Sequence, residues 1–105
     1  MPEIRESPDY VTFINVFEVR PEDQPDVVKI LLETMEVASK CEGFISASAH
    51  RSLDGTHVFT YLQWRRPEDL RAYQASPEFQ EIAPRFAGRI QFESFQCDVV
   101  HVAEA

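Results

Sequence analysis

The sequence predicts a single α+β domain, in which two helical segments cover a four-stranded antiparallel sheet. The chain of 105 residues has the length of one domain. Four segments are rich in β-branched and aromatic residues, which favour strands, and two others repeat apolar residues at helical spacing. The order of these segments, β-α-β-β-α-β, is that of the ferredoxin-like fold.

The first strand is predicted over residues 11–19, where both alternating sets of side chains are mostly apolar. Such a strand is usually covered on both faces. A helix is predicted over 23–40, because apolar residues recur there at helical spacing and Pro21 precedes acidic residues that suit a first turn. Gly43 is a suitable stop signal after this helix.

The second and third strands are predicted over 44–51 and 57–64. The Asp54-Gly55 pair between them is typical of a hairpin turn. Strict alternation along the second strand places Phe44 and His50 on the same face.

The second helical region begins at Pro67 and begins again at Ser76-Pro77, where a serine N-cap precedes a proline at the first helical position. Pro84 is expected to end or kink this region. The fourth strand is predicted over 90–102. The predicted domain spans 11–102, between an N-terminal arm at 1–10 and a tail at 103–105.

The predicted sheet has more apolar surface than one layer of helices covers. The first, third and fourth strands are apolar on both faces, whereas helices lie on only one face in this fold. An uncovered apolar sheet face marks an interaction site. We therefore expect a homodimer in which two sheets pack face to face, giving a dimeric α+β barrel. The alternative is that the helices and termini also cover the second face.

Composition and motif content disfavour several classes of function. Ten Lys and Arg against 18 Asp and Glu give a net charge of −8, which disfavours nucleic acid and membrane surfaces as partners. No apolar run has the length of a membrane span, and the N-terminus has no signal-peptide pattern. Cys41 and Cys97 are isolated, so we expect a reduced, cytoplasmic setting. Neither a metal-ligand spacing nor a glycine-rich phosphate loop occurs, so no metal and no cofactor are expected.

Three residues within the strands are the first candidates for a site. Asn15 shares a strand face with Phe13 and Phe17, and a buried amide needs a partner, which a backbone group, a water or a ligand would supply. Trp64 is the sole tryptophan, and core packing competes there with a role in a site. His50 ends the second strand and is either a rim histidine or a base.

Five stretches of sequence carry a resemblance to a known family. They are 13–24 (FINVFEVRPEDQ), 43–47 (GFISA), 50–56 (HRSLDGT), 61–65 (YLQWR) and 76–79 (SPEF). In this order they resemble the antibiotic biosynthesis monooxygenase superfamily, whose members are small dimeric α+β-barrel proteins. The resemblance extends over about residues 11–102 and is more specific for the fold than for one reaction.

The resemblance implies oxidation of a small aromatic substrate by O2. The quinone-forming members oxidise an anthrone or a similar polycyclic phenol in aromatic polyketide biosynthesis, without metal or organic cofactor. A Trp at the end of their third strand and an Asn four residues earlier are assigned to the site. Trp64 matches that Trp, whereas Thr60 stands where the Asn is expected.

We therefore expect one pocket with hydrogen-bond donors at a developing oxyanion, a base, and an aromatic lining. The expected catalytic residues are Trp64, Asn15, His50 and Thr60, and the expected substrate-binding residues are Phe13, Phe17, Tyr61 and Tyr73.

Three alternatives remain open, of which a purely structural dimer without a ligand is disfavoured by the polar Asn15 and His50 in the expected pocket. A non-catalytic or cyclase-like dimer that binds a small molecule is favoured by Thr60, because a hydroxyl offers less than an amide at that position. A heme-degrading monooxygenase shares Asn15 and Trp64, but it also needs a proximal histidine on the second helix. Residues 65–89 contain no histidine, so heme degradation ranks below oxidation of a small aromatic substrate.

Overall fold

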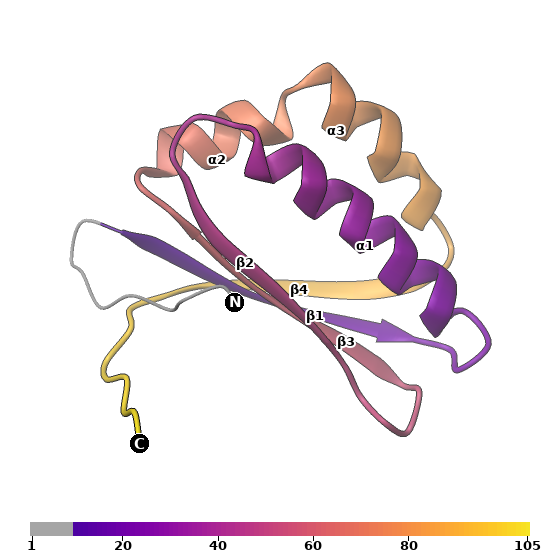
Figure 1. Cartoon of the computed structure of the whole chain (residues 1–105). Helices are drawn as coiled ribbons and strands as arrows, with labels where there is room; N and C mark the ends of the chain where they lie inside the picture. Colours follow the sequence, from indigo (N-terminus) through magenta and orange to yellow (C-terminus); the bar gives the residue numbers. More distant parts are fainter. Residues whose placement is uncertain (1–9) are drawn as a thin grey trace.

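The computed structural model describes residues 10–105 and places all helices on one side of a four-stranded antiparallel sheet (Figure 1). The predicted α+β, ferredoxin-like fold is confirmed. The elements are β1 (Val11–Val19), α1 (Gln24–Ser39), β2 (Phe44–Arg51), β3 (His57–Trp64), α2 (Pro67–Gln74), α3 (Pro77–Ile82), the 3-10 helix η1 (Ala83–Phe86) and β4 (Ile90–Cys97).

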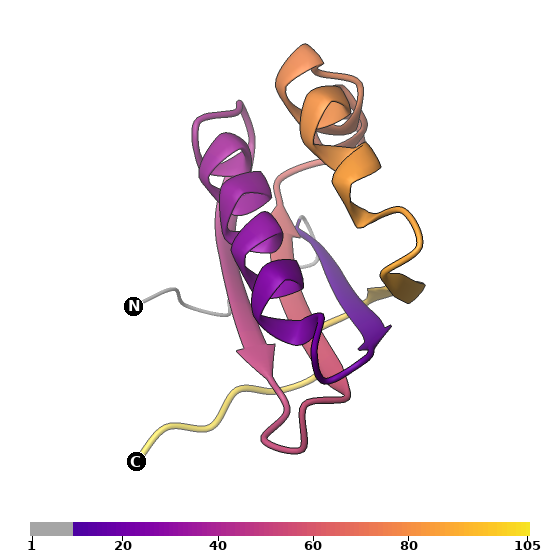
Figure 2. The same ribbon diagram turned by 90° about the vertical axis from the view of Figure 1, so that its right-hand side faces the viewer.

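The strand order is β2-β3-β1-β4, so β1 and β3 are central and β4 is an edge strand. Helix α1 packs on β2 and β3 and also contacts α3. Figure 2 shows α1 and the α2–α3 segment side by side above the sheet. We call the sheet face beneath these helices the helix face and the opposite one the open face.

Two buried clusters fill the space between the sheet and the helices. One joins β1, β3 and the first half of α1, and consists of Phe17, Val19, Val27, Leu31 and Val58. The other joins β3, α2 and the end of α1, and consists of Ala38, Trp64 and Tyr73. Apolar burial at both ends of α1 fixes this helix on the sheet.

A β-bulge near the start of β2 reverses which side chains point to which face. Phe44 pairs with Trp64, but the next pair is Ser46 with Gln63. The shift adds one residue to β2, and an extra residue moves all later side chains to the other face. Phe44 therefore lies on the helix face, whereas His50, which pairs with Phe59, lies on the open face. The expectation that Phe44 and His50 share a face is wrong for this reason.

Two boundaries differ from those predicted. Strand β4 ends at Cys97 rather than at residue 102, because Cys97 already pairs with Thr12, the second residue of β1. The second helical region is three short helices, since the Ser76 hydroxyl accepts the Phe79 N–H at 3.2 Å and starts α3 afresh.

The predicted arm at 1–10 lies outside the described residues except for Tyr10, and the domain limits 11–102 stay a prediction. Within residues 10–105, no helix is both long and apolar enough to cross a membrane.

Candidate functional site

A cavity of about 200 Å³ lies between the sheet and the helices. Its lining is mostly apolar and contains the aromatic side chains of Phe13, Phe17, Tyr73, Phe79, Phe86 and Phe92. The cavity opens to solvent beside β4, where Phe92 is 53% exposed and Ser94 is also exposed. A concave, aromatic-lined space of this kind suits a flat apolar ligand.

Asn15 and Thr60 form a polar pair on the sheet side of the cavity. They stand opposite each other in the β1–β3 register, as alternation along the strands predicts, and both line the cavity. The Asn15 amide donates to the Thr60 hydroxyl at 3.0 Å. The Asn15 Oδ1 atom is buried and has no hydrogen-bond partner within the described residues. An unpaired buried acceptor costs about 1–3 kcal/mol, so this pair is incomplete until another donor reaches it.

Trp64 lies behind the cavity wall. Its side chain is fully buried, packs edge-on against Phe44 at 5.5 Å, and stacks on Tyr73 at 5.3 Å. Tyr73 lines the cavity and Trp64 does not. The indole Nε1 has no hydrogen-bond partner within residues 10–105. The sequence predicts that Trp64 points into the pocket, whereas the structure places its indole behind the cavity wall, between Phe44 and Tyr73.

The Tyr73 hydroxyl is held as a neutral donor. It donates to the main-chain oxygen of Thr34 at 3.0 Å, which joins α2 to α1. Burial is the main cause that raises the pKa of Tyr73 to about 12. A phenol with this pKa stays protonated near neutral pH, so it orients and covers a ligand rather than accepting a proton from it.

His50 and Tyr61 do not belong to the cavity. Both lie on the open face, where their rings meet edge-on at 5.9 Å. His50 Nε2 is 3.2 Å from the Ser48 hydroxyl. The expectation of one pocket containing His50 and Tyr61 is wrong, since the β-bulge in β2 turns His50 away and alternation along β3 puts Tyr61 opposite to Thr60.

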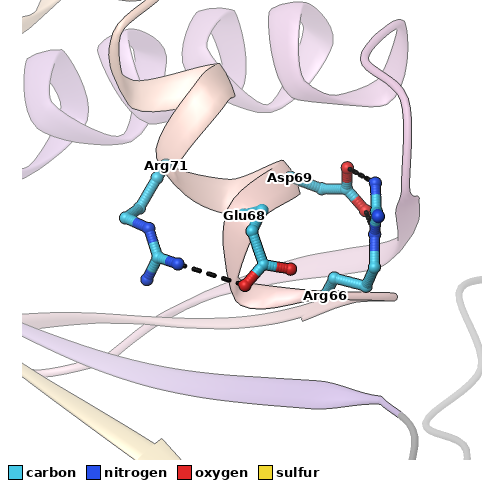
Figure 3. Close-up of polar contacts among 4 residues, drawn as sticks. All are labelled: Arg66, Glu68, Asp69 and Arg71. Atoms are coloured by element: carbon cyan, nitrogen blue, oxygen red, sulfur yellow. Dashed lines mark hydrogen bonds and ion pairs between the residues drawn. The ribbon is translucent and has the colours of Figure 1, made fainter.

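A close backbone approach positions helix α2, which carries Tyr73, and two local ion pairs support its first turns. Figure 3 shows Arg66 turned back onto Asp69 and Arg71 onto Glu68. The Arg66–Asp69 pair is 3.0 Å long and Asp69 is buried. Asp69 in turn lies against Gly43, where φ is +82° and an added Cβ would overlap the Asp69 carboxyl group. Only glycine fits at this position.

A second contact closes the cavity from the helix side. Glu33 on α1 and Arg85 on η1 form a two-bonded ion pair with distances of 2.8 and 2.9 Å. The hydrogen bond from Arg85 lowers the pKa of Glu33. The pair holds η1, and with it Phe86, over the cavity.

Comparison with known proteins decides the family. A sequence profile of the antibiotic biosynthesis monooxygenase family matches residues 10–85. The chain belongs to this family. It is also 42% identical, over 81 residues, to the tetracenomycin-F1 monooxygenase of Streptomyces glaucescens, covering 76% of this chain and 72% of that protein.

Solved structures of other members of this fold superpose on the chain. SnoaB, a cofactor-independent oxygenase from Streptomyces nogalater, matches with a TM-score of 0.76 and 21% identity over 90% of this chain and 96% of its own. An antibiotic biosynthesis monooxygenase-like protein from Nitrosomonas europaea matches with a TM-score of 0.81 and 11% identity, over 93% and 97% of the two chains. At these identities the superpositions show the shared fold.

Several cavity residues of this family member were missed from the sequence. Leu31, Thr34 and Met35 come from the middle of α1, and Phe79 and Phe86 come from α3 and η1. Ser94 on β4 could have been identified from the sequence. It follows Ile90 and Phe92 at every second position, so it interrupts an apolar row on one face of the strand. The described part of this family member contains no cluster of three His, Cys, Asp or Glu side chains placed to hold a metal ion.

Proposed function

We propose that this protein is a monooxygenase that uses O2 to oxidise an electron-rich polycyclic phenol of the anthrone type to a quinone, without metal or organic cofactor, in aromatic polyketide biosynthesis. The observation that carries the proposal is the aromatic cavity with the incomplete Asn15–Thr60 pair on its sheet side. The 42% identity to tetracenomycin-F1 monooxygenase supports it.

The electron-rich substrate itself reduces O2, so the reaction needs no oxidising group from the protein. The deprotonated anthrone passes one electron to O2, and the two radicals combine at the ring carbon to give a hydroperoxide once a proton is added. Loss of water from the hydroperoxide leaves the new carbonyl. One oxygen atom of O2 is then in the product, and the other leaves as water with the two hydrogens of the methylene carbon.

The cavity residues would orient the substrate and exclude water from this step. The aromatic walls hold a flat ring system, and Asn15 and Thr60 lie where an oxygen substituent of that ring would sit. Trp64 keeps a proposed place in the site through the resemblance and its contact with Tyr73. Among the described residues that line the cavity there is no acid, histidine or lysine, so the acidic substrate gives its proton to bulk solvent and enters the cavity as the anion.

The test is O2 uptake with 1,8-dihydroxyanthrone in metal-depleted buffer containing EDTA. We expect uptake of one O2 per anthrone at a rate well above that of the uncatalysed oxidation, and one labelled oxygen in the quinone when the gas is ¹⁸O2. The Gln96→Ala variant should oxidise the anthrone at the wild-type rate, because Gln96 lies on β4 outside the cavity. A rate equal to that without protein would overturn the proposed oxidation.

A binding protein without catalysis is the second candidate. The absence of a base among the cavity-lining residues favours it, as does Thr60 in place of an amide. It predicts tight binding of the hydroxyanthrone under nitrogen with no acceleration in air.

We also propose that the open face of the sheet pairs with a second copy of the chain. Ile14, Tyr61 and Phe95 are register neighbours across three strands of this face, and Phe95 is 49% exposed. Val16 and Phe59 continue the same apolar patch. Burying it against an identical face is the simplest way to remove it from water.

A further inference from the structure

A row of three short polar side chains crosses the sheet beneath the cavity. Asn15 on β1 pairs with Thr60 on one side and with Ser94 of β4 on the other. All three lie on the helix face and line the cavity. We call Thr60, Asn15 and Ser94 the polar row. Phe13 and Phe17 flank Asn15 along β1, so the row is bounded by aromatic rings.

Two polar groups of the polar row have no hydrogen-bond partner within residues 10–105. The Thr60 hydroxyl accepts the Asn15 N–H, and the buried Asn15 Oδ1 has no partner within the described residues. The Ser94 hydroxyl makes no hydrogen bond within residues 10–105 and lies exposed at the open side of the cavity. By contrast, the Thr34 hydroxyl on the helix side already donates to the Leu31 carbonyl at 2.7 Å. A ligand therefore finds an acceptor at Asn15 and a hydroxyl at Ser94.

The spacing of these two positions selects a substitution pattern. Asn15 and Ser94 are direct neighbours on adjacent strands, which lie about 4.8 Å apart. Two oxygens in the 1,3 relationship on one aromatic ring are separated by about this backbone spacing, whereas 1,2 oxygens lie much closer together. A flat ring with its edge on the row can then place one oxygen at each residue.

We propose that the polar row is a binding subsite for a 1,3-dihydroxylated aromatic ring. One ligand hydroxyl donates to Asn15 Oδ1, and the second hydroxyl bonds with Ser94 Oγ. Ser94 is thereby a specificity-determining residue, because it binds the oxygen at the ligand edge nearest β4. The proposal deepens the proposed function, since it names the substrate class for the same cavity.

The test measures binding of three naphthalene probes by isothermal titration calorimetry under nitrogen. The probes are 1,3-dihydroxynaphthalene, its 2,3 isomer, and 1,3-dimethoxynaphthalene, which accepts hydrogen bonds but donates none. Wild-type protein is expected to bind the 1,3-diol about 5-fold or more tighter than either of the other probes, because each satisfied hydrogen bond contributes about that much.

Variants of Ser94 test whether this residue binds the second oxygen of the 1,3-diol. Ser94→Ala should lower affinity for the 1,3-diol about 5-fold and leave affinity for the 2,3 isomer unchanged. Ser94→Thr keeps a hydroxyl and should keep the preference. Gln96→Ala, on the same face of β4 but outside the cavity, should match wild type. Ser94 is exposed on an edge strand, so its variants are expected to fold, and circular dichroism checks this.

Three outcomes would overturn the subsite: no binding of the 1,3-diol, equal affinity for the dimethyl ether, or an unchanged preference in Ser94→Ala. The outcomes are separable from those of the proposed function. If the 1,3 preference depends on Ser94 but O2 uptake with 1,8-dihydroxyanthrone fails, the subsite stands and the oxidation does not. If uptake succeeds and the preference is missing, only the subsite is wrong.

Discussion

Asn15 and Thr60 are joined across the two central strands by a side-chain hydrogen bond of 3.0 Å, although 45 residues separate them in the sequence. The bond lies under the cavity, so it contributes to the fold and to the ligand site at once. Changes at Thr60 can therefore separate the two contributions.

Replacing Thr60 by valine should destabilise the protein. Valine has nearly the shape of threonine but cannot accept the Asn15 N–H, which would remain buried without a partner. The free energy of unfolding in urea is expected to fall by about 1–3 kcal/mol. An unchanged value would mean that another group satisfies the Asn15 amide.

Replacing Thr60 by asparagine tests the departure from the family pattern. The new amide provides both a donor and an acceptor beside Asn15, so oxidation of 1,8-dihydroxyanthrone should be maintained or accelerated. The measurement is kcat/KM from O2 uptake, with the melting temperature as the folding control. A strong loss of activity in a stably folded variant would show that the cavity depends on the smaller threonine.

Replacing Trp64 by phenylalanine should affect stability more than rate. The indole fills a fully buried space between Phe44 and Tyr73, so unfolding is expected to become easier by about 1–3 kcal/mol. Because Nε1 does not line the cavity, kcat/KM should fall by less than about 10-fold. A greater fall would indicate that the N–H reaches the substrate during turnover.

The pH dependence of oxidation should follow the substrate and not a histidine. The rate should increase as pH rises through the substrate's own pKa and then level off, since the pKa of Tyr73 is raised to about 12 and no other cavity residue titrates near neutrality. His50→Gln is expected to give the same profile, because His50 lies on the open face. An inflection in the wild-type rate profile that disappears in this variant would restore His50 as a base.

Light scattering should give a mass near twice the 12.1 kDa of the chain. Phe95→Asp places a charge in the exposed patch of the open face and should give a monomer of unchanged secondary structure. Glu93→Ala, at the next position of the same face, is the matched control. A monomeric wild-type protein at micromolar concentration would contradict the face-to-face pairing.

The periodic spacing of apolar residues made most of the secondary structure predictable from the sequence. Alternating and helical patterns located all four strands and α1 to within a residue at most boundaries, apart from the end of β4. Alternation along β1 and β3 also brought Asn15 and Thr60 to one face, because both strands are regular. These are local consequences of backbone geometry, which one sequence carries.

The rest of the site depends on facts that local patterns do not contain. His50 was assigned to the wrong face because one extra residue between Phe44 and Ser46 is invisible to alternation. The α1 and η1 residues over the cavity depend on where two helices dock, which long-range contacts such as Glu33–Arg85 decide. Sequence patterns do not show that Trp64 stands behind the cavity wall, because that position depends on how its indole packs between Phe44 and Tyr73.

The contact between Gly43 and Asp69 links a loop outside the cavity to the helix that carries a cavity-lining side chain. Gly43 leaves no room for even one methyl group before Asp69, and Asp69 belongs to the helix that carries Tyr73. A larger residue at 43 would displace the start of α2, and the Tyr73 ring would move with it. Position 43 thus influences the placement of a cavity-lining ring, although Gly43 itself lies outside the cavity.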